Sequence, residues 1–180
     1  MRKPLLLLPL LAALLATVAT SCDKVLDLLE FNVEDSQSFT VPATPIVGQL
    51  PVFPPITVAS TSKTTYANNK TSADYVQDVR LDRCMLTITS PQGQTFDFLR
   101  RIKVYISSDA NGTNKVLLAS LDPVPTGVTS IQLTPADQKL DLFLRADSYS
   151  LTTEVETSQP LAQAVTIRVD SRFKVKAKPL

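Results

Sequence analysis

The stretch from Val165 to Ala177 alternates between apolar and polar side chains, and this pattern constrains the fold more than any other feature of the chain. One face would carry Val165, Ile167, Val169, Phe173, Val175 and Ala177, and the other Thr166, Arg168, Asp170, Arg172, Lys174 and Lys176. A period of two is typical of a β-strand that has one buried face and one face in water. The pattern therefore predicts a long strand in an antiparallel sheet with a single solvated side.

Earlier segments carry the same alternation or a short continuous apolar run. The further predicted strands lie within residues 31–41, 56–66, 84–88, 102–106 and 116–121. Residues 101–107 and 115–121 are predicted to form a hairpin, because the turn between them contains Asn111 and Gly112, which accept positive φ angles. A second predicted hairpin pairs residues 151–155 with 165–169 and places Glu154 beside Arg168 on the outer face.

Helix is predicted to be a minor component. Thr134, Pro135 and Asp137 form a helix start signal, and about ten residues from there are predicted to be helical. A second helix of one or two turns is predicted within residues 71–78. The pattern as a whole predicts an all-β fold, mainly an antiparallel β-sandwich or partly open barrel, with one or two short helices.

Residues 41–55 are rich in proline, with Pro42, Pro45, Pro51, Pro54 and Pro55 in one stretch. Proline cannot donate a hydrogen bond to a neighbouring strand, so this stretch is predicted to be an extended connector or a sheet edge. A polyproline ligand for a partner protein is the alternative.

The first residues of the chain have the composition of an export signal. Met1-Arg2-Lys3 precedes a run of about 14 apolar residues, which is too short to span a bilayer because a spanning helix needs roughly 20. The run ends at Ala19-Thr20-Ser21-Cys22, and polar residues follow. Small residues at this position indicate a cleavage site.

Small residues directly before a cysteine resemble the lipobox of bacterial lipoproteins. The resemblance covers residues 1–22 and implies that the thiol of Cys22 receives a diacylglycerol, that residues 1–21 are removed, and that the new amino terminus is acylated, with chains such as palmitate. The family prefers leucine three residues before the cysteine, where this chain has Ala19. The alternative is ordinary cleavage, which would leave Cys22 as a thiol and make a disulfide with Cys84 possible. With Cys22 acylated, Cys84 is predicted to be a small buried apolar residue.

The resemblance also implies a domain organisation and a location. Residues 1–21 would be a lipoprotein-type signal peptide, 22–30 a membrane-proximal segment with one or two turns of helix, and 31–180 a single β-sandwich domain. The chain would be exported to the cell envelope of a Gram-negative bacterium and attached by lipid, to the outer membrane in preference to the inner one. Two or three acyl chains make such attachment effectively permanent.

Composition excludes several kinds of chemistry. The chain has no histidine, which removes Ser-His-Asp and Cys-His catalysis and the commonest metal ligand, and two cysteines do not make a structural zinc site. The net charge is +1, whereas a nucleic-acid binder usually has a strong basic excess. No cofactor, no metal and no nucleic-acid partner is therefore predicted.

Three groups of polar residues are candidate sites, and for each the plainer interpretation is preferred. Residues 109–114 resemble a calcium loop only superficially and are predicted to be a hairpin turn. Glu154 and Glu156 are spaced as a glycosidase pair but are predicted to lie on a solvated face. Two basic strand faces are interpreted as ordinary solvated sheet faces; they contain Arg101, Lys103 and Tyr105, and Arg172, Lys174, Lys176 and Lys178.

The leading functional hypothesis is a non-enzymatic, lipid-anchored envelope module that binds, adapts or has a structural role. Its partners would be the membrane, through Cys22, and an unknown envelope protein or glycan. One alternative is a carrier of a lipid or other apolar ligand, and another is an envelope hydrolase that uses carboxylates only.

Overall fold

The computed structural model describes residues 28–44, 47–49 and 55–180. The strands are β1 (Leu29–Val41), β2 (Gly48–Gln49), β3 (Ile56–Ala59), β4 (Val76–Ser90), β5 (Leu99–Ser107), β6 (Val116–Leu121), β7 (Ser130–Pro135), β8 (Ser148–Thr157) and β9 (Val165–Ala177). The helical elements are α1 (Ser62–Asn68), α2 (Asp141–Leu144) and the 3₁₀ turns η1 (Ala73–Tyr75) and η2 (Phe96–Phe98). The chain is therefore an all-β protein with short helices, as predicted.

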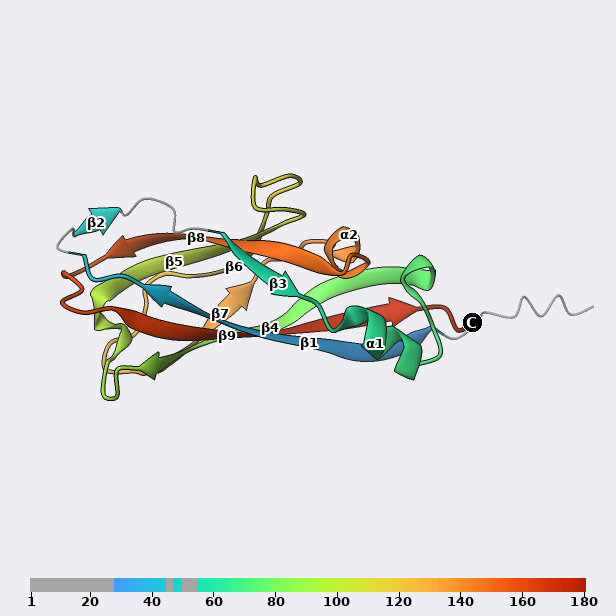
Figure 1. Ribbon diagram of the computed structural model, residues 1–180, viewed down its shortest axis with the longest axis horizontal. Coiled ribbons are helices and arrows are strands. Elements are labelled where there is room, and N and C mark those ends of the chain that lie inside the picture. The colour runs from blue at the N-terminus through green and yellow to red at the C-terminus, as the bar shows by residue number, and fades with distance from the viewer. Residues whose placement is uncertain (1–27, 45–46, 50–54) are drawn as a thin grey trace, which may run out of the picture.

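The strands form one antiparallel sheet that curls into an elongated, nearly closed barrel (Figure 1). Neighbours follow the order β1-β9-β4-β7-β6-β5-β8, and the remaining edge of β8 pairs with β2 and with β3. β7 joins the two halves of the sheet, because residues 130–133 pair with β4 and residues 134–135 pair with β6.

The long final strand, β9, is confirmed and occupies a central place. It pairs with β1 along all 13 residues from Val165 to Ala177 and with β4 on its other side. Its alternating side chains are buried as expected, and Val165, Phe173 and Val175 have no exposed surface. Buried side chains from Val33 to Ala177 form a single core.

One predicted hairpin is confirmed and the other is wrong. β5 and β6 pair through Ile102↔Leu121 and Val104↔Ala119, as expected for the turn at Asn111 and Gly112. β8 does not pair with β9; it pairs with β5 instead. A hairpin would have used at most the ten residues of β8, whereas β1 pairs with all 13 residues of β9 and β4 pairs with residues 166–177 on its other side.

The helices differ from the prediction in position and length. Thr134 and Pro135 lie in β7, and the predicted ten-residue helix is reduced to the four residues of α2. Residues 134–135 are in strand β7 and not in a helix because the pairing of Thr134 with Ser120 on β6 completes the link between the two halves of the sheet. The turn predicted within 71–78 is confirmed as η1, which ends at Tyr75 because β4 begins there.

α1 is an element that the sequence pattern did not predict, since residues 56–66 read as a strand. β3 ends at Ala59, and the carboxylate of Asp35 on β1 accepts a hydrogen bond from the backbone N–H of Thr61, the N-cap residue of α1. The acceptor that begins this helix is therefore 26 residues away in the sequence. A local pattern contains no signal for it.

The proline-rich stretch lies along a sheet edge where it is described. β2 pairs with the end of β8, and Thr44 forms an isolated bridge with Leu161. Residues 45–46 and 50–54 lie outside the described residues. Leu29 and Glu30, predicted to belong to a membrane-proximal helical segment, are the first residues of β1. No helix in the described ranges is long and apolar enough to cross a bilayer.

Candidate functional site

Cys22, the predicted lipidation site, lies outside the described residues. The nearest described residue is Leu28, which directly precedes β1. Because Leu29 pairs with Ala177 of β9, which also pairs with Val76 of β4, the chain enters the domain at one end of the three-stranded region β1-β9-β4. This end also carries the last residues of the chain (Figure 1).

A large hollow lies on the outer face of these same three strands. We call it the outer groove; it has a volume of about 470 Å³ and is lined by Glu34, Asp35, Ser36, Arg83, Met85, Asp170, Ser171 and Arg172. The strand register assembles it, since Glu34 is opposite Arg172 on β9, which in turn is opposite Arg83 on β4. Next to this row, β4 has an irregularity between Leu81 and Arg83.

Three of the charged residues that line the outer groove, Glu34, Asp170 and Arg172, have charged partners in the groove or beside it. The Nε of Arg172 lies 2.8 Å from a carboxylate oxygen of Glu34, and its Nη1 lies 3.8 Å from one of Asp82. Asp170 accepts hydrogen bonds from the hydroxyl of Ser36 at 2.7 Å and from the Nε of Arg168 at 2.9 Å. Burial opposes ionisation of Asp170, but these two donors hold its pKa below the ordinary value.

Arg83 differs from Arg172, the other cation that lines the groove. It is half-buried, and it makes no ion pair or hydrogen bond through its side chain within the described part of the chain. It acts on Asp170 only through a longer electrostatic interaction. A guanidinium has a fork of N–H donors suited to a carboxylate or phosphate, so Arg83 is available for an anionic group from outside.

A second polar cluster is buried inside the barrel, around Asp35. Its carboxylate is 4% exposed and accepts hydrogen bonds from the hydroxyls of Ser60 and Tyr149, each at 3.0 Å, and from the backbone N–H of Thr61 at 2.7 Å. Burial, together with the neighbouring carboxylate, raises the pKa of Tyr149. The cluster fastens the start of α1 to β1, and its acceptor Asp35 is also one of the residues that line the outer groove.

Glu154 and Glu156 lie in surroundings different from those predicted. Glu154 accepts a hydrogen bond from the hydroxyl of Tyr105 at 2.9 Å and pairs with Lys115 at 3.4 Å. Glu156 pairs with Arg100 and Arg101, while Arg168, the predicted partner of Glu154, pairs with Asp170. The carboxylates are thus neutralised by neighbouring cations along the β5 and β8 surface, and neither faces a second carboxylate across a cleft.

The two basic strand faces are likewise interleaved with acids. Lys174 and Lys176 both pair with Glu30, and the ammonium of Lys115 lies 4.2 Å from the ring centre of Tyr105. The pairing holds the pKa of Glu30 below its ordinary value and raises that of Lys176. Sequence reasoning found the cations but not their partners, which lie on neighbouring strands.

The loop that superficially resembles a calcium site is a turn. The carboxylate of Asp109 accepts hydrogen bonds from the backbone N–H groups of Asn111 and Thr113 and from the hydroxyl of Thr113. These donors hold the pKa of Asp109 low. Among the residues that the structure describes, no group of three metal-binding side chains occurs.

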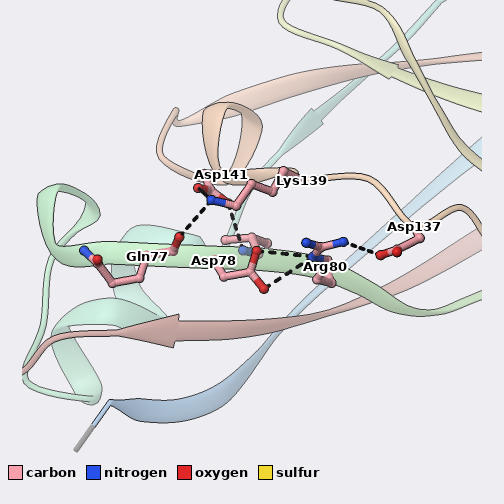
Figure 2. A network of polar contacts seen from close by, with 7 residues as sticks. Gln77, Asp78, Arg80, Asp137, Lys139 and Asp141 are labelled. Atoms are coloured by element: carbon pink, nitrogen blue, oxygen red, sulfur yellow. Dashed lines mark hydrogen bonds and ion pairs between the residues drawn. The ribbon is translucent and has the colours of Figure 1, made fainter. Parts of the chain in front are cut away.

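A polar network between α2 and β4 was also missed by sequence reasoning. The carboxylate of Asp141 accepts a hydrogen bond from the backbone N–H of Val79 at 2.9 Å, and Lys139 donates to the carbonyl of Gln77 (Figure 2). Arg80 pairs with Asp78 and with Asp137 on the segment before α2. The network attaches this segment to β4, and its charged groups are paired with each other or with the backbone of β4.

Cys84 is buried without exposed surface, as predicted, and is a free thiol. Burial raises its pKa to about 12, against the opposing effect of a hydrogen bond with Ser171, and burial raises the pKa of Tyr66 to about 12 as well. Both groups release their protons more readily when the chain is unfolded. The stability they confer is therefore complete below about pH 9 and is lost as the pH rises towards 12.

We expect the urea midpoint of the domain to fall steadily above about pH 9 because unfolding then releases these protons. In a Cys22→Ala variant, where Cys84 is the sole thiol, Ellman's reagent at about pH 8 should not react with the folded chain and should titrate one thiol in urea. Rapid reaction of the folded chain would contradict the burial of Cys84. The Cys84→Ala variant serves as the control for the alkaline titration.

By its fold the chain is an all-β, mainly antiparallel, barrel-like domain with a charged groove on one outer face. No protein-family model matches it. No curated protein matches its sequence.

Proposed function

We propose that the chain is a lipid-anchored protein of the bacterial cell envelope whose barrel is a non-enzymatic binding or adaptor module. The observation that carries this proposal is the order Arg2-Lys3, apolar run, Ala19-Thr20-Ser21-Cys22, placed directly before a folded domain. Acylation at Cys22 would attach the barrel by the end at which β1 begins. Attachment to the outer membrane is expected in preference to the inner one.

The binding surface in this proposal is the outer groove. Two arginines line it, and Arg172 pairs with Glu34, so we assign to Arg83 the contact with an anionic group of an envelope protein or glycan. The absence of histidine and the pairing of the groove's acids favour binding over catalysis. In the described part of the barrel, the apolar cavity lined by Phe39, Phe98 and their neighbours has a volume of only about 10 Å³. Such a volume does not support the carrier alternative, because it is about the space of one water molecule.

The anchor is tested by metabolic labelling with a palmitate analogue in cells that express the wild type or Cys22→Ala. We expect the wild type to carry label and to sediment with membranes. The Cys22→Ala variant should lose both, since no other residue would carry an acyl chain. Survival of label and membrane association in the variant would overturn the proposal.

The same cells test the groove through Arg83→Ala, which removes the free guanidinium from a position that makes no ion pair in the described chain. Label and membrane association should be retained, and a species cross-linked to the wild type by formaldehyde should be lost. Lys103→Ala on β5 is the control, because Lys103 is likewise a cation without an ion pair in the described residues but is exposed and lies outside the groove. Equal loss in both variants would count against the groove.

A further inference from the structure

The end of the barrel at which the chain enters exposes apolar side chains and free lysines together. One residue beyond the row formed by Leu29, Ala177 and Val76 lie Leu28, Lys178 and Tyr75. The backbone N–H of Lys178 donates to the carbonyl of Tyr75 at 3.0 Å, and that of Leu180 donates to the carbonyl of Lys70 at 3.0 Å. We call these residues the entry-end patch: Leu28, Lys70, Tyr75, Lys178 and Leu180.

The apolar members of the entry-end patch are unusual in their exposure. Leu28 is 41% exposed, Tyr75 42% and Leu180 77%, and they are three of the five exposed large apolar residues in the described ranges. The other two are Leu142 on α2 and Val47 beside β2. Exposed apolar side chains that gather at one place indicate a contact surface, whereas scattered ones do not.

The charges of the patch favour an anionic partner. Lys70 and Lys178 are exposed and make no ion pair with described residues, in contrast to Lys174 and Lys176, which both pair with Glu30. Asp74 is the exposed acid beside them. Tyrosine and lysine suit the boundary between hydrocarbon and headgroups, because each joins an apolar stem to a polar end.

The position of the patch relative to Cys22 identifies its partner. Six residue steps separate Cys22 from Leu28, a span of at most about 21 Å for an extended chain. An acyl anchor at Cys22 would therefore keep this end of the barrel near the bilayer. Such a tether turns a weak contact into an intramolecular one with a high effective concentration.

We infer that the entry-end patch rests on an anionic phospholipid surface. This inference depends on the lipid anchor of the proposed function. Leu28, Tyr75 and Leu180 contact the headgroup boundary, Lys70 and Lys178 contact phosphate groups, and β2, at the opposite end of the barrel, is held away from the membrane (Figure 1). The anchored protein thereby has one orientation instead of rotating freely on its tether.

The chain contains no tryptophan, so a single introduced tryptophan reports its own surroundings. The acylated, full chain carrying Tyr75→Trp is reconstituted into vesicles of phosphatidylethanolamine and phosphatidylglycerol with brominated acyl chains. We expect quenching at least about threefold stronger than for Val47→Trp, because interfacial side chains lie within about 10 Å of the acyl boundary. Val47 is the matched control, since it is an exposed apolar residue beside β2.

A second pair of variants tests the charge. Lys178→Glu in the Tyr75→Trp background should weaken the quenching about twofold or more, whereas Lys103→Glu on β5 should leave it unchanged. Mass spectrometry of the same samples reports the acyl chains. A wild type without acyl chains would overturn the proposed function, and it would also remove the membrane anchor at Cys22 on which this inference depends. An acylated chain that quenches equally at residues 75 and 47 would overturn the orientation alone.

Discussion

Replacement of Phe173 by alanine is expected to destabilise the domain by about 3–5 kcal/mol. Phe173 is fully buried in β9, opposite Val33 on β1 and Leu81 on β4. Its ring meets that of Tyr149 edge to face, with the ring centres 6.0 Å apart. Because β9 is paired with a strand on each side, the backbone cannot move inward to fill the cavity, so the loss should be near the upper part of this range.

Urea unfolding followed by circular dichroism measures the effect. Lys174→Ala is the matched control, since Lys174 is the next residue of the same strand and is exposed; its effect should stay within about 0.5 kcal/mol. Phe173→Leu should lie between the two. Equal midpoints for Phe173→Ala and Lys174→Ala would contradict the central position of β9 in the core.

Asp35→Ala is expected to cost about 3 kcal/mol and to loosen α1 in particular. The variant leaves three donors without their acceptor, namely the hydroxyls of Ser60 and Tyr149 and the backbone N–H of Thr61. Two of these donors belong to the turn between β3 and α1. The helix should therefore lose the contact that begins it.

Hydrogen exchange distinguishes this local effect from a general loss of stability. Amides of residues 60–68 should exchange much faster in Asp35→Ala under conditions where β9 remains protected. Asp82→Ala is the control, because Asp82 is an exposed acid beside the outer groove whose ion-pair partner, Arg172, is 3.8 Å away. Asp35→Asn keeps an acceptor oxygen and should be intermediate. Unchanged exchange in residues 60–68 would show that Asp35 does not hold α1.

The arrangement of the two candidate surfaces follows from one strand group. The outer groove lies on the outer face of β1, β9 and β4, and the entry-end patch lies just beyond the ends of the same strands. If the entry-end patch contacts the membrane, the outer groove opens in a direction along the membrane plane, neither towards the bilayer nor away from it. An anchored adaptor with this geometry would meet partners that lie beside it in the same membrane.

The sequence by itself determined the fold class, the strand at Val165–Ala177, the hairpin around Asn111 and Gly112, and the burial of Cys84. These features depend on local patterns: the alternation of side chains, the turn preferences of asparagine and glycine, and apolar neighbours. The same patterns predict the export signal and Cys22, which lie outside the described residues.

Only the tertiary structure decided which strands pair, where helices begin and which charges remain free. The alternation of apolar and polar residues shows that β8 and β9 are strands. It does not show which strands they pair with, because any strand with an apolar face could lie beside them. In the structure the neighbours of β9 are β1 and β4. α1 begins where Asp35 supplies an acceptor from another strand. Arg83 is free because its neighbours pair with each other. Backbone pairing and electrostatics act between groups that are close in space, and such groups are often far apart in sequence.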